Sequence, residues 1–162
     1  MELRELAESD LPSLLDLCQR TLPLDPFSLP TLRHHMLDEP SQHPTYQLSI
    51  WDGARLAGVM VGGARETQER PDAWVRLFAI DPADRRKGLA TRLLGELESR
   101  LRADGHTRLH VANSVPNYFW PGLDLRYTAG LCFLQKSGFQ RAGDAVNMQE
   151  ATMIPAVIWA SA

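Results

Sequence analysis

Apolar residues recur at helical spacing in four stretches of the chain. The strongest pattern places the leucines at positions 89, 93, 97 and 101 on one face of a long helix, which begins at about Gly88 and which Gly105 should end. Similar spacing predicts three further helices, over residues 11–22, 30–37 and 127–136.

Between these helices, apolar residues alternate with polar ones or run together over short stretches, as they do in β-strands. The predicted strands cover residues 2–6, 46–50, 56–64, 73–80, 107–113, 139–150 and 153–160. Asp52-Gly53 marks a hairpin turn, while Gly58 and Gly62 indicate a bulge or the close approach of another segment. The order of these elements predicts an α/β fold with helices around one mixed sheet, and places residues 1–162 in a single domain.

The composition argues against several functional classes. The apolar fraction of 44% and the charged fraction of 23% are ordinary for a soluble globular protein, and the net charge of −3 has the wrong sign for a nucleic-acid-binding surface. No run approaches the roughly 18 apolar residues that span a bilayer. The charged N-terminus, MELRELAESD, does not resemble a secretory signal. We therefore expect a cytoplasmic protein with neither a nucleic-acid nor a membrane partner.

The cysteines and histidines do not have the spacing of a metal site or of a disulfide framework. Cys18 and Cys132 belong to no CxxC pair and fall on apolar faces of predicted helices, so we expect two buried thiols. His34 and His35 are adjacent on a helix and point apart, and with His43 they give no H-x-x-x-H spacing. We expect no bound metal.

The most informative segment joins the strand at 73–80 to the long helix. It carries three consecutive basic residues, Arg85, Arg86 and Lys87, and then Gly88 at the start of the helix. A helix N-terminus exposes free N–H groups and a partial positive charge, which suit phosphate oxygens, and glycine lets the backbone approach an anion closely. The Walker pattern and the dinucleotide-binding pattern are both missing.

This segment resembles motif A of the GNAT family of N-acetyltransferases, Q/R-x-x-G-x-G/A, here Arg85-x-x-Gly88-x-Ala90. The preceding VRLFAIDP, the opening LRELAESDLPSLLDLC and the Lys-Ser-Gly-Phe at 136–139 are also similar to segments of the family. The resemblance implies a GNAT fold, with a mixed, mostly antiparallel sheet of six to seven strands and about four helices. It further implies acetyl-CoA as co-substrate and a small-molecule amine as acceptor, and a homodimer fits the family as well.

The resemblance also implies which residues contact acetyl-CoA. Phe78, Ala79 and Ile80 would pair with the pantetheine arm, and N–H groups near Ala79 and Ile80 would steady the thioester oxygen. The pyrophosphate would bind the loop that follows, which comprises Arg85, Arg86, Lys87, Gly88, Leu89, Ala90 and Thr91. Asn113, at the end of the strand at 107–113, is a further expected cofactor contact.

The chain departs from the family at the proton donor. Leu134 stands where the family usually has a tyrosine that protonates the departing thiolate. Tyr127, earlier on the same helical face, is either an alternative acid or a residue for packing or cofactor contact. A thiol can also leave without a donor. Asp72 and His110 are candidate bases, since histidine titrates close to neutral pH; His110 could equally be a hydrogen-bonded sheet residue, and ordered water could replace both.

Residues 113–126 form an insertion relative to the family and include three consecutive aromatic residues, Tyr118, Phe119 and Trp120. Three aromatic side chains on a loop are rarely all solvated, so they line an acceptor pocket, form a dimer contact or pack locally. We take Tyr118 and Trp120 as candidate acceptor contacts.

Arg76 is the remaining candidate for the acceptor site. It shares a strand face with Trp74, Phe78 and Ile80. If that face meets the acceptor, Arg76 favours a carboxylate or a phosphate on it; otherwise Arg76 is an ordinary ion-pairing residue. The missing tyrosine and the insertion also support a second hypothesis, in which the chain is an acetyl-CoA-binding module or sensor without turnover.

Overall fold

The computed structural model describes residues 1–38, 43–65, 72–112, 114 and 119–143. The main elements in this part of the chain are β1 (Glu2–Glu5), α1 (Leu11–Thr21), α2 (Leu29–Arg33), β2 (Gln47–Asp52), β3 (Arg55–Ala64), β4 (Asp72–Ile80), α3 (Leu89–Ala103), β5 (Arg108–Val111) and α4 (Thr128–Lys136). Each lies within a few residues of its predicted bounds, and a π-helical segment, His34–Asp38, continues α2. Residues 139–143 form no strand, and the rest of the last two predicted strands lies outside the described residues.

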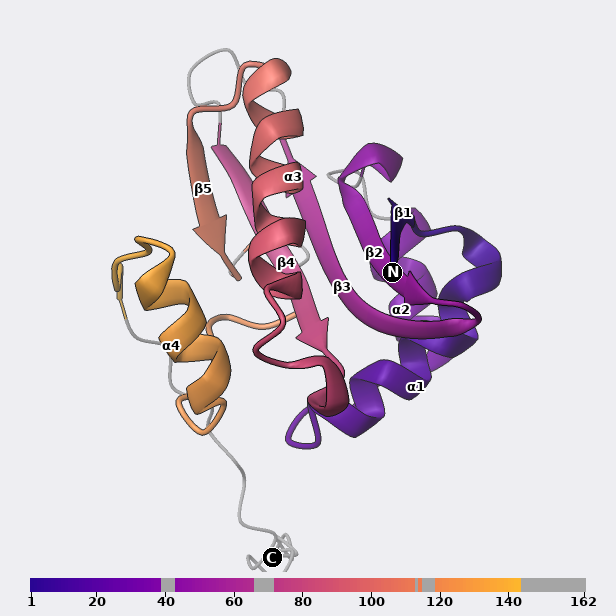
Figure 1. Ribbon diagram of the computed structural model, residues 1–162. Helices are drawn as coiled ribbons and strands as arrows, with labels where there is room; N and C mark the ends of the chain where they lie inside the picture. The colour runs from indigo at the N-terminus through magenta and orange to yellow at the C-terminus, as the bar shows by residue number, and fades with distance from the viewer. Residues whose placement is uncertain (39–42, 66–71, 113, 115–118, 144–162) are drawn as a thin grey trace, which may run out of the picture.

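The described strands form one sheet in the order β1-β2-β3-β4-β5 (Figure 1). The first three pairs are antiparallel, and β4 pairs with β5 in parallel through the α3 crossover. This confirms the mixed, mostly antiparallel α/β class, with five strands among the described residues where six to seven were expected.

Helices cover both faces of the sheet and bury two apolar clusters. On one face α1 and α2 place Leu14, Leu17 and Leu32 against β3 and β4. On the other face α3 places Leu93 and Leu97 against β2, β3 and β4. As the sequence predicts, these leucines recur at helical spacing because each row forms the buried face of an amphipathic helix.

Glycines in β3 let α3 and a neighbouring strand approach the sheet closely. A Cβ atom at Gly62 would lie 2.7 Å from the Leu97 Cδ1 atom, and one at Gly58 would lie 2.5 Å from the Ile80 Cδ1 atom. The expected close approach at these two positions is confirmed.

A bulge in β4 changes which side chains share a face. Leu77 pairs with Val61 and Val75 pairs with Gly62, so Arg76 is an extra residue without its own partner on β3. Ala73 and Val75 consequently lie on the α3 side together with Phe78 and Ile80, while Leu77 and Ala79 lie on the α1 side. The expectation that Arg76 shares a face with Phe78 and Ile80 is therefore wrong, because it assumed unbroken alternation.

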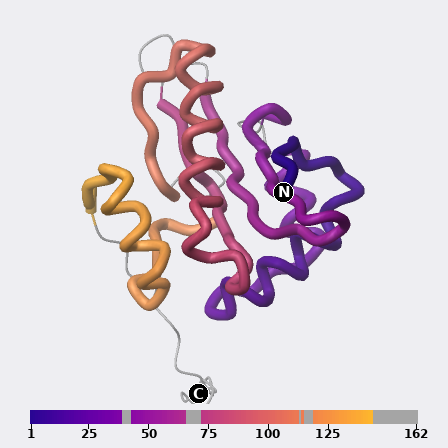
Figure 2. The backbone as a smooth tube through the Cα atoms, viewed as in Figure 1, coloured from indigo at the N-terminus to yellow at the C-terminus, as the bar shows by residue number. Residues whose placement is uncertain are grey.

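The strands β4 and β5 stay together only over their first residues. Their four pairs run from Asp72↔Arg108 to Val75↔Val111, and the Ala112 N–H then donates to the Val75 carbonyl at 2.9 Å. Beyond that point β5 ends, while β4 continues to Ile80 (Figure 2). The last part of β4 thus has one sheet edge with no strand beside it in the described chain.

The two cysteines, both expected to be buried, differ in their exposure. Cys18 lies on the buried face of α1, and burial raises the pKa of its thiol to about 12. Cys132 is exposed on α4, so its predicted burial is wrong, because α4 has more apolar positions than packed ones.

Among the described helices, none is long and apolar enough to cross a membrane.

Candidate functional site

The backbone before α3 presents a row of free N–H groups. Gly88 caps the helix in a left-handed conformation with φ of 79°, and Arg86 is also left-handed with φ of 64°. The first hydrogen bond of the helix runs from the Arg92 N–H to the Gly88 carbonyl. Within the described chain, the N–H groups of residues 86–91 have no protein acceptor, so this helix start can accept an anion.

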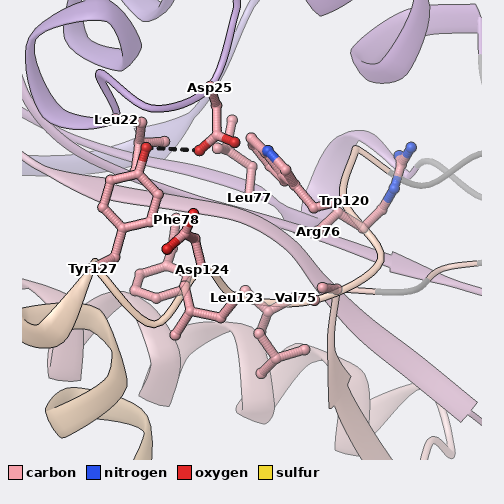
Figure 3. Close-up of a pocket in the computed structure, with 13 residues that line it drawn as sticks. Leu22, Asp25, Val75, Arg76, Leu77, Phe78, Trp120, Leu123, Asp124 and Tyr127 are labelled. Carbon is pink, nitrogen blue, oxygen red and sulfur yellow. Dashed lines mark hydrogen bonds between the residues drawn. The ribbon is translucent and has the colours of Figure 1, made fainter. Parts of the chain in front are cut away.

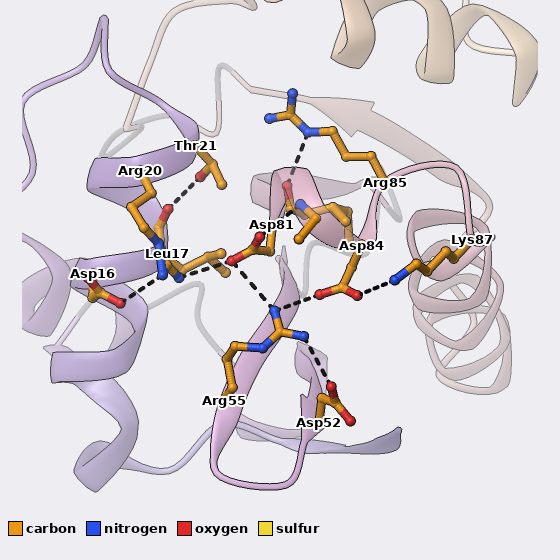
Figure 4. A network of polar contacts seen from close by, with 12 residues as sticks. Asp16, Leu17, Arg20, Thr21, Asp52, Arg55, Asp81, Asp84, Arg85 and Lys87 are labelled. Atoms are coloured by element: carbon orange, nitrogen blue, oxygen red, sulfur yellow. Dashed lines mark hydrogen bonds and ion pairs between the residues drawn. The ribbon is translucent and has the colours of Figure 1, made fainter.

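Beneath this loop, Asp84 holds two cations (Figure 4). Its carboxylate, only 2% exposed, accepts hydrogen bonds from Arg55 at 2.6 Å and from Lys87 at 2.8 Å. These bonds, that of Arg55 first, hold the pKa of Asp84 below its usual value. The loop is thereby tied to the β2–β3 hairpin, and Lys87 already has an anionic partner.

A second carboxylate fixes the other end of the same loop. Asp81 accepts a hydrogen bond from the Ala83 N–H and lies 3.2 Å from the guanidinium of Arg20 on α1. Arg85 donates from Nε to the Ile80 carbonyl at 3.3 Å. Of the three basic residues, Arg86 alone has no ion pair or side-chain hydrogen bond to a described residue, so its guanidinium is the one available to an incoming anion.

The open edge of β4 supplies further free backbone groups. The Val75 carbonyl faces β5, and the Asp81 N–H donates to the Ala57 carbonyl of β3. Since backbone groups alternate in direction along a strand, the N–H groups of Phe78 and Ile80 face the open edge, and that of Ala79 faces β3. The expected pair of N–H donors is thus corrected from Ala79 and Ile80 to Phe78 and Ile80.

A small pocket of about 50 Å³, here called the inner pocket, lies where β4 and β5 diverge (Figure 3). It is formed by β4, the end of β5, the end of α1 and the segment before α4, with lining residues that include Leu22, Asp25, Val75, Arg76, Phe78, Ala112, Trp120, Asp124 and Tyr127. Nearly all of its exposed surface is apolar. It can therefore hold an uncharged group at the end of the open β4 edge.

Tyr127 lies at the N-terminal end of α4 and points into this region. Its hydroxyl donates to Asp25 Oδ2 at 2.7 Å and accepts a hydrogen bond from the Leu24 N–H at 2.9 Å (Figure 3). Burial, together with the bond to Asp25, raises the pKa of Tyr127 well above its usual value. The candidate acid is thus in the pocket, but its proton is directed at a carboxylate.

A larger pocket of about 310 Å³, here called the outer pocket, adjoins the inner one. Its lining residues are Leu24, Asp25, Pro26, Phe27, Thr31, His35, Phe119, Trp120 and Pro121. Asp25 and Trp120 line both pockets. Of the predicted aromatic loop residues, Trp120 is therefore at the site, whereas Tyr118 lies outside the described residues.

Arg76 lies behind the outer pocket. It is 2% exposed, donates to the His35 carbonyl at 2.9 Å, and lies 3.3 Å from His35 Nδ1. Its guanidinium also lies 5.8 Å from the centre of the Phe119 ring. The arginine borders the inner pocket, but its head group is used to hold His35 and Phe119.

The candidate bases are not in either pocket. His110 Nε2 lies 3.2 Å from Asp72 Oδ1, and the centre of the His110 ring lies 5.9 Å from that of the Trp74 ring. Asp72 is the first residue of β4, about 20 Å along an extended strand from Phe78. Asp72 and His110 thus contact each other and line neither pocket. Asn113, the expected cofactor contact, lies outside the described residues.

The sequence analysis missed Asp25 and Phe27. Both lie in the proline-containing loop between α1 and α2, which was interpreted only as a connection. A carboxylate and an aromatic ring among prolines, on a loop between two helices, were the available signal. Among the described residues, no group of His, Cys, Asp and Glu has the arrangement of a metal site.

Comparisons with known proteins are consistent with this arrangement. The sequence model of the Acetyltransferase (GNAT) family matches residues 4–118. A search of curated proteins returned no match.

Solved structures with the same fold include three acetyltransferases. Aminoglycoside 6'-N-acetyltransferase AAC(6')-IG from Acinetobacter haemolyticus has a TM-score of 0.66 at 18% identity, over 93% of this chain and 99% of that one. Aminoglycoside acetyltransferase meta-AAC0020 from an uncultured soil metagenomic sample, in complex with trehalose, has a TM-score of 0.67 at 19% identity, over 93% and 95%. The alanine N-acetyltransferase of ribosomal protein S18 from Escherichia coli has a TM-score of 0.62 at 20% identity, over 88% and 79%.

Proposed function

Because the chain belongs to the GNAT family of acyl-CoA-dependent N-acetyltransferases, we propose that it transfers the acetyl group of acetyl-CoA to a primary amine of a small molecule. One observation carries the proposal. The free N–H groups of residues 86–91, the open edge of β4 and the inner pocket form a continuous path that matches the phosphate, amide and acyl parts of the co-substrate.

The residues along this path have distinct roles in the proposal. The N–H groups before α3 and the Arg86 guanidinium bind the pyrophosphate. Phe78 and Ile80 offer backbone groups to the pantetheine amides, as one strand does to the next. The acetyl group then reaches the inner pocket, where water is largely excluded by apolar side chains.

The proposed chemistry is direct attack. The amine reacts in its neutral form, so an ammonium first gives up one proton to water. The nitrogen then forms a bond to the acetyl carbon while the bond from that carbon to sulfur breaks, and it releases a second proton to water. One of the Phe78 and Ile80 N–H groups stabilises the negative charge on the carbonyl oxygen. Thiols have a pKa of about 8.5, so the CoA sulfur can leave as an anion, and Leu134 in place of a tyrosine does not prevent the reaction.

The test separates co-substrate binding from turnover. Thr91→Glu places a carboxylate in the first turn of α3, where it favours the helix but repels a pyrophosphate. We expect CoA affinity, measured by calorimetry, to fall about tenfold or more while the melting temperature is unchanged or higher. Ser99→Glu, exposed later on the same helix, is the matched control and should leave the affinity unchanged. Equal affinities in all three proteins would contradict the proposed path.

A second candidate function is an acetyl-CoA-binding module without turnover. Two observations favour it, namely Leu134 at the family's tyrosine position and the Tyr127 proton bound to Asp25. Mass spectrometry of amines incubated with acetyl-CoA and the protein distinguishes the two. Transfer of one acetyl group makes an amine about 42 Da heavier. An amine with this added mass excludes the hypothesis of a module without turnover, whereas tight acetyl-CoA binding with every amine unchanged supports it.

A further inference from the structure

The outer pocket carries a single negative charge and no positive one on its described lining residues. Asp25 supplies the carboxylate, and most of the other lining residues are apolar or aromatic, while the exposed surface of the pocket is polar and apolar in about equal parts. Arg76 is not among them, because its guanidinium lies behind His35 and Phe119. A pocket of this kind favours a ligand with one positive charge on an apolar body.

Asp25 is oriented for such a cation. Its Oδ2 atom accepts the Tyr127 hydroxyl, and its Oδ1 atom has no partner in the described chain. The nearby Asp124 is different, because Arg126 binds it through both oxygens and holds its pKa at about 2. Of the two carboxylates at the inner pocket, Asp25 makes no ion pair with a described residue, although Arg126 is near enough to interact with it electrostatically.

Aromatic rings form the walls of the outer pocket. Phe27 and Trp120 meet edge to face with their centres 5.4 Å apart, and Phe119 stacks on Trp120 at 5.0 Å. His35 in turn stacks on Phe119 at 4.0 Å. Phe27, Phe119 and Trp120 are each only half-buried, so ring surface remains for a ligand. Such surfaces attract planar rings and ammonium groups.

From these features we infer that the acceptor is a singly charged aromatic amine, with its ammonium on Asp25 and its ring against Phe27 and Trp120. Asp25 and Trp120 line both pockets, so an ammonium on Asp25 stands at the entrance to the inner pocket. The ring then occupies the outer pocket, whose volume of about 310 Å³ suits a small amine. This inference deepens the proposed function and rests on it.

The same features disfavour polycations. An aminoglycoside or a polyamine carries several ammonium groups, each of which needs an anionic or polar partner when it leaves water. The described lining of the outer pocket offers one carboxylate, one threonine and one histidine among aromatic, proline and leucine side chains. An arylalkylamine needs only the carboxylate and the rings.

The experiment compares amines of matched charge and shape with acetyl-CoA as donor. The probes are 2-phenylethylamine, 2-cyclohexylethylamine, spermidine, an aminoglycoside and a peptide that begins with alanine. We expect kcat/KM to be highest for 2-phenylethylamine and about three- to tenfold lower for the cyclohexyl compound, which has the same charge but no planar ring. Binding of 2-phenylethylamine is measured in parallel by calorimetry.

Variants assign the effect to the pocket. Asp25→Asn keeps the shape and an oxygen for Tyr127 but removes the charge, so affinity for 2-phenylethylamine should fall about 10- to 100-fold. Trp120→Leu should abolish the preference for the phenyl over the cyclohexyl amine. Leu125→Ala is the control, because Leu125 lies on the same segment and is 64% exposed. Unchanged CoA affinity in each variant shows that the fold is intact.

The outcomes separate this inference from the proposed function. Turnover of spermidine, the aminoglycoside or the peptide at least as fast as 2-phenylethylamine would overturn the inference and leave the proposed function standing. Binding of 2-phenylethylamine that Asp25→Asn weakens, with no amine acetylated, would support the inference about the pocket and contradict the proposed function. Absence of 2-phenylethylamine binding would also overturn the inference.

Discussion

Tyr127 and Asp25 are joined by a 2.7 Å hydrogen bond across the inner pocket, although they come from opposite ends of the described chain. The same hydroxyl accepts the Leu24 N–H, so the start of α4 holds the loop between α1 and α2 in place. The phenolic proton is committed to the carboxylate in this arrangement. We therefore expect Tyr127 to position Asp25 rather than to protonate the departing sulfur.

Replacing Tyr127 with phenylalanine tests this role in the reaction. The change removes both hydrogen bonds of the hydroxyl, the one to the Asp25 carboxylate and the one from the Leu24 N–H. We therefore expect KM for the amine to rise about two- to tenfold and kcat to stay within about twofold. Steady-state kinetics with varied amine measures both. A general acid is worth about 100-fold or more in kcat, so a fall of that size would show that Tyr127 donates a proton to the sulfur.

The same residue should make stability depend on alkaline pH. The pKa of Tyr127 is raised in the folded protein relative to about 10 in the unfolded chain. Its contribution to the free energy of unfolding is therefore complete below pH 10 and is lost as the pH rises toward the folded value. We expect the difference in melting temperature between wild type and Tyr127→Phe to shrink between pH 9 and pH 11. A constant difference would contradict the raised pKa.

Neighbouring cations of the loop before α3 should differ in their effect on CoA binding. Arg86 has no ion pair in the described chain, whereas Lys87 is bound to Asp84 at 2.8 Å. We expect Arg86→Ala to weaken CoA about tenfold in calorimetry, with the loss smaller at high salt, since screening weakens exposed charges. Lys87→Ala should change CoA affinity less than threefold. Equal losses in the two variants would mean that Lys87 leaves Asp84 when CoA binds.

Asp84 should matter for the stability of this loop at neutral pH. Hydrogen bonds from Arg55 and Lys87 lower its pKa in the folded protein, so its contribution to stability is present above about pH 4 and is lost as the pH falls through the folded value. We expect Asp84→Asn to melt at a lower temperature than wild type at pH 7, with the gap closing toward pH 2. Asp16→Asn, at an exposed ion pair, is the control and should change the melting temperature little.

The sequence predicted the described elements well but not the bulge in β4. Helices α1 and α3 follow from rows of leucines, because burial of one stripe is a local and repeated signal. The extra residue at Arg76 depends on how β4 pairs with β3, and nothing in the run VRLFAI marks it. Its effect reaches the site, since it turns Arg76 toward His35 and changes which side chains face α3.

The parts of the candidate site that consist of consecutive residues could be predicted from the sequence. The parts that depend on contacts between residues far apart in the sequence could not. The run from Arg85 to Ala90 indicated the anion-binding helix start directly. The pairing of Tyr127 with Asp25, and that of Asp84 with Arg55, bring together residues that only the fold makes neighbours. Loop residues such as Asp25 carry no periodic pattern, so they could not be singled out from the sequence.

A final prediction concerns the close packing of α3 on β3. A Cβ atom at Gly62 would lie 2.7 Å from Leu97 Cδ1 and 3.1 Å from the Cβ atom of Tyr46, so Gly62→Ala forces both side chains to shift. We expect it to lower the free energy of unfolding by about 1–3 kcal/mol in urea denaturation. Gly95→Ala is the matched control, because Gly95 is exposed on α3 and a Cβ atom there meets nothing within 4 Å. That change should stabilise the protein by up to about 1 kcal/mol through helix propensity, and equal effects of the two substitutions would contradict the close approach.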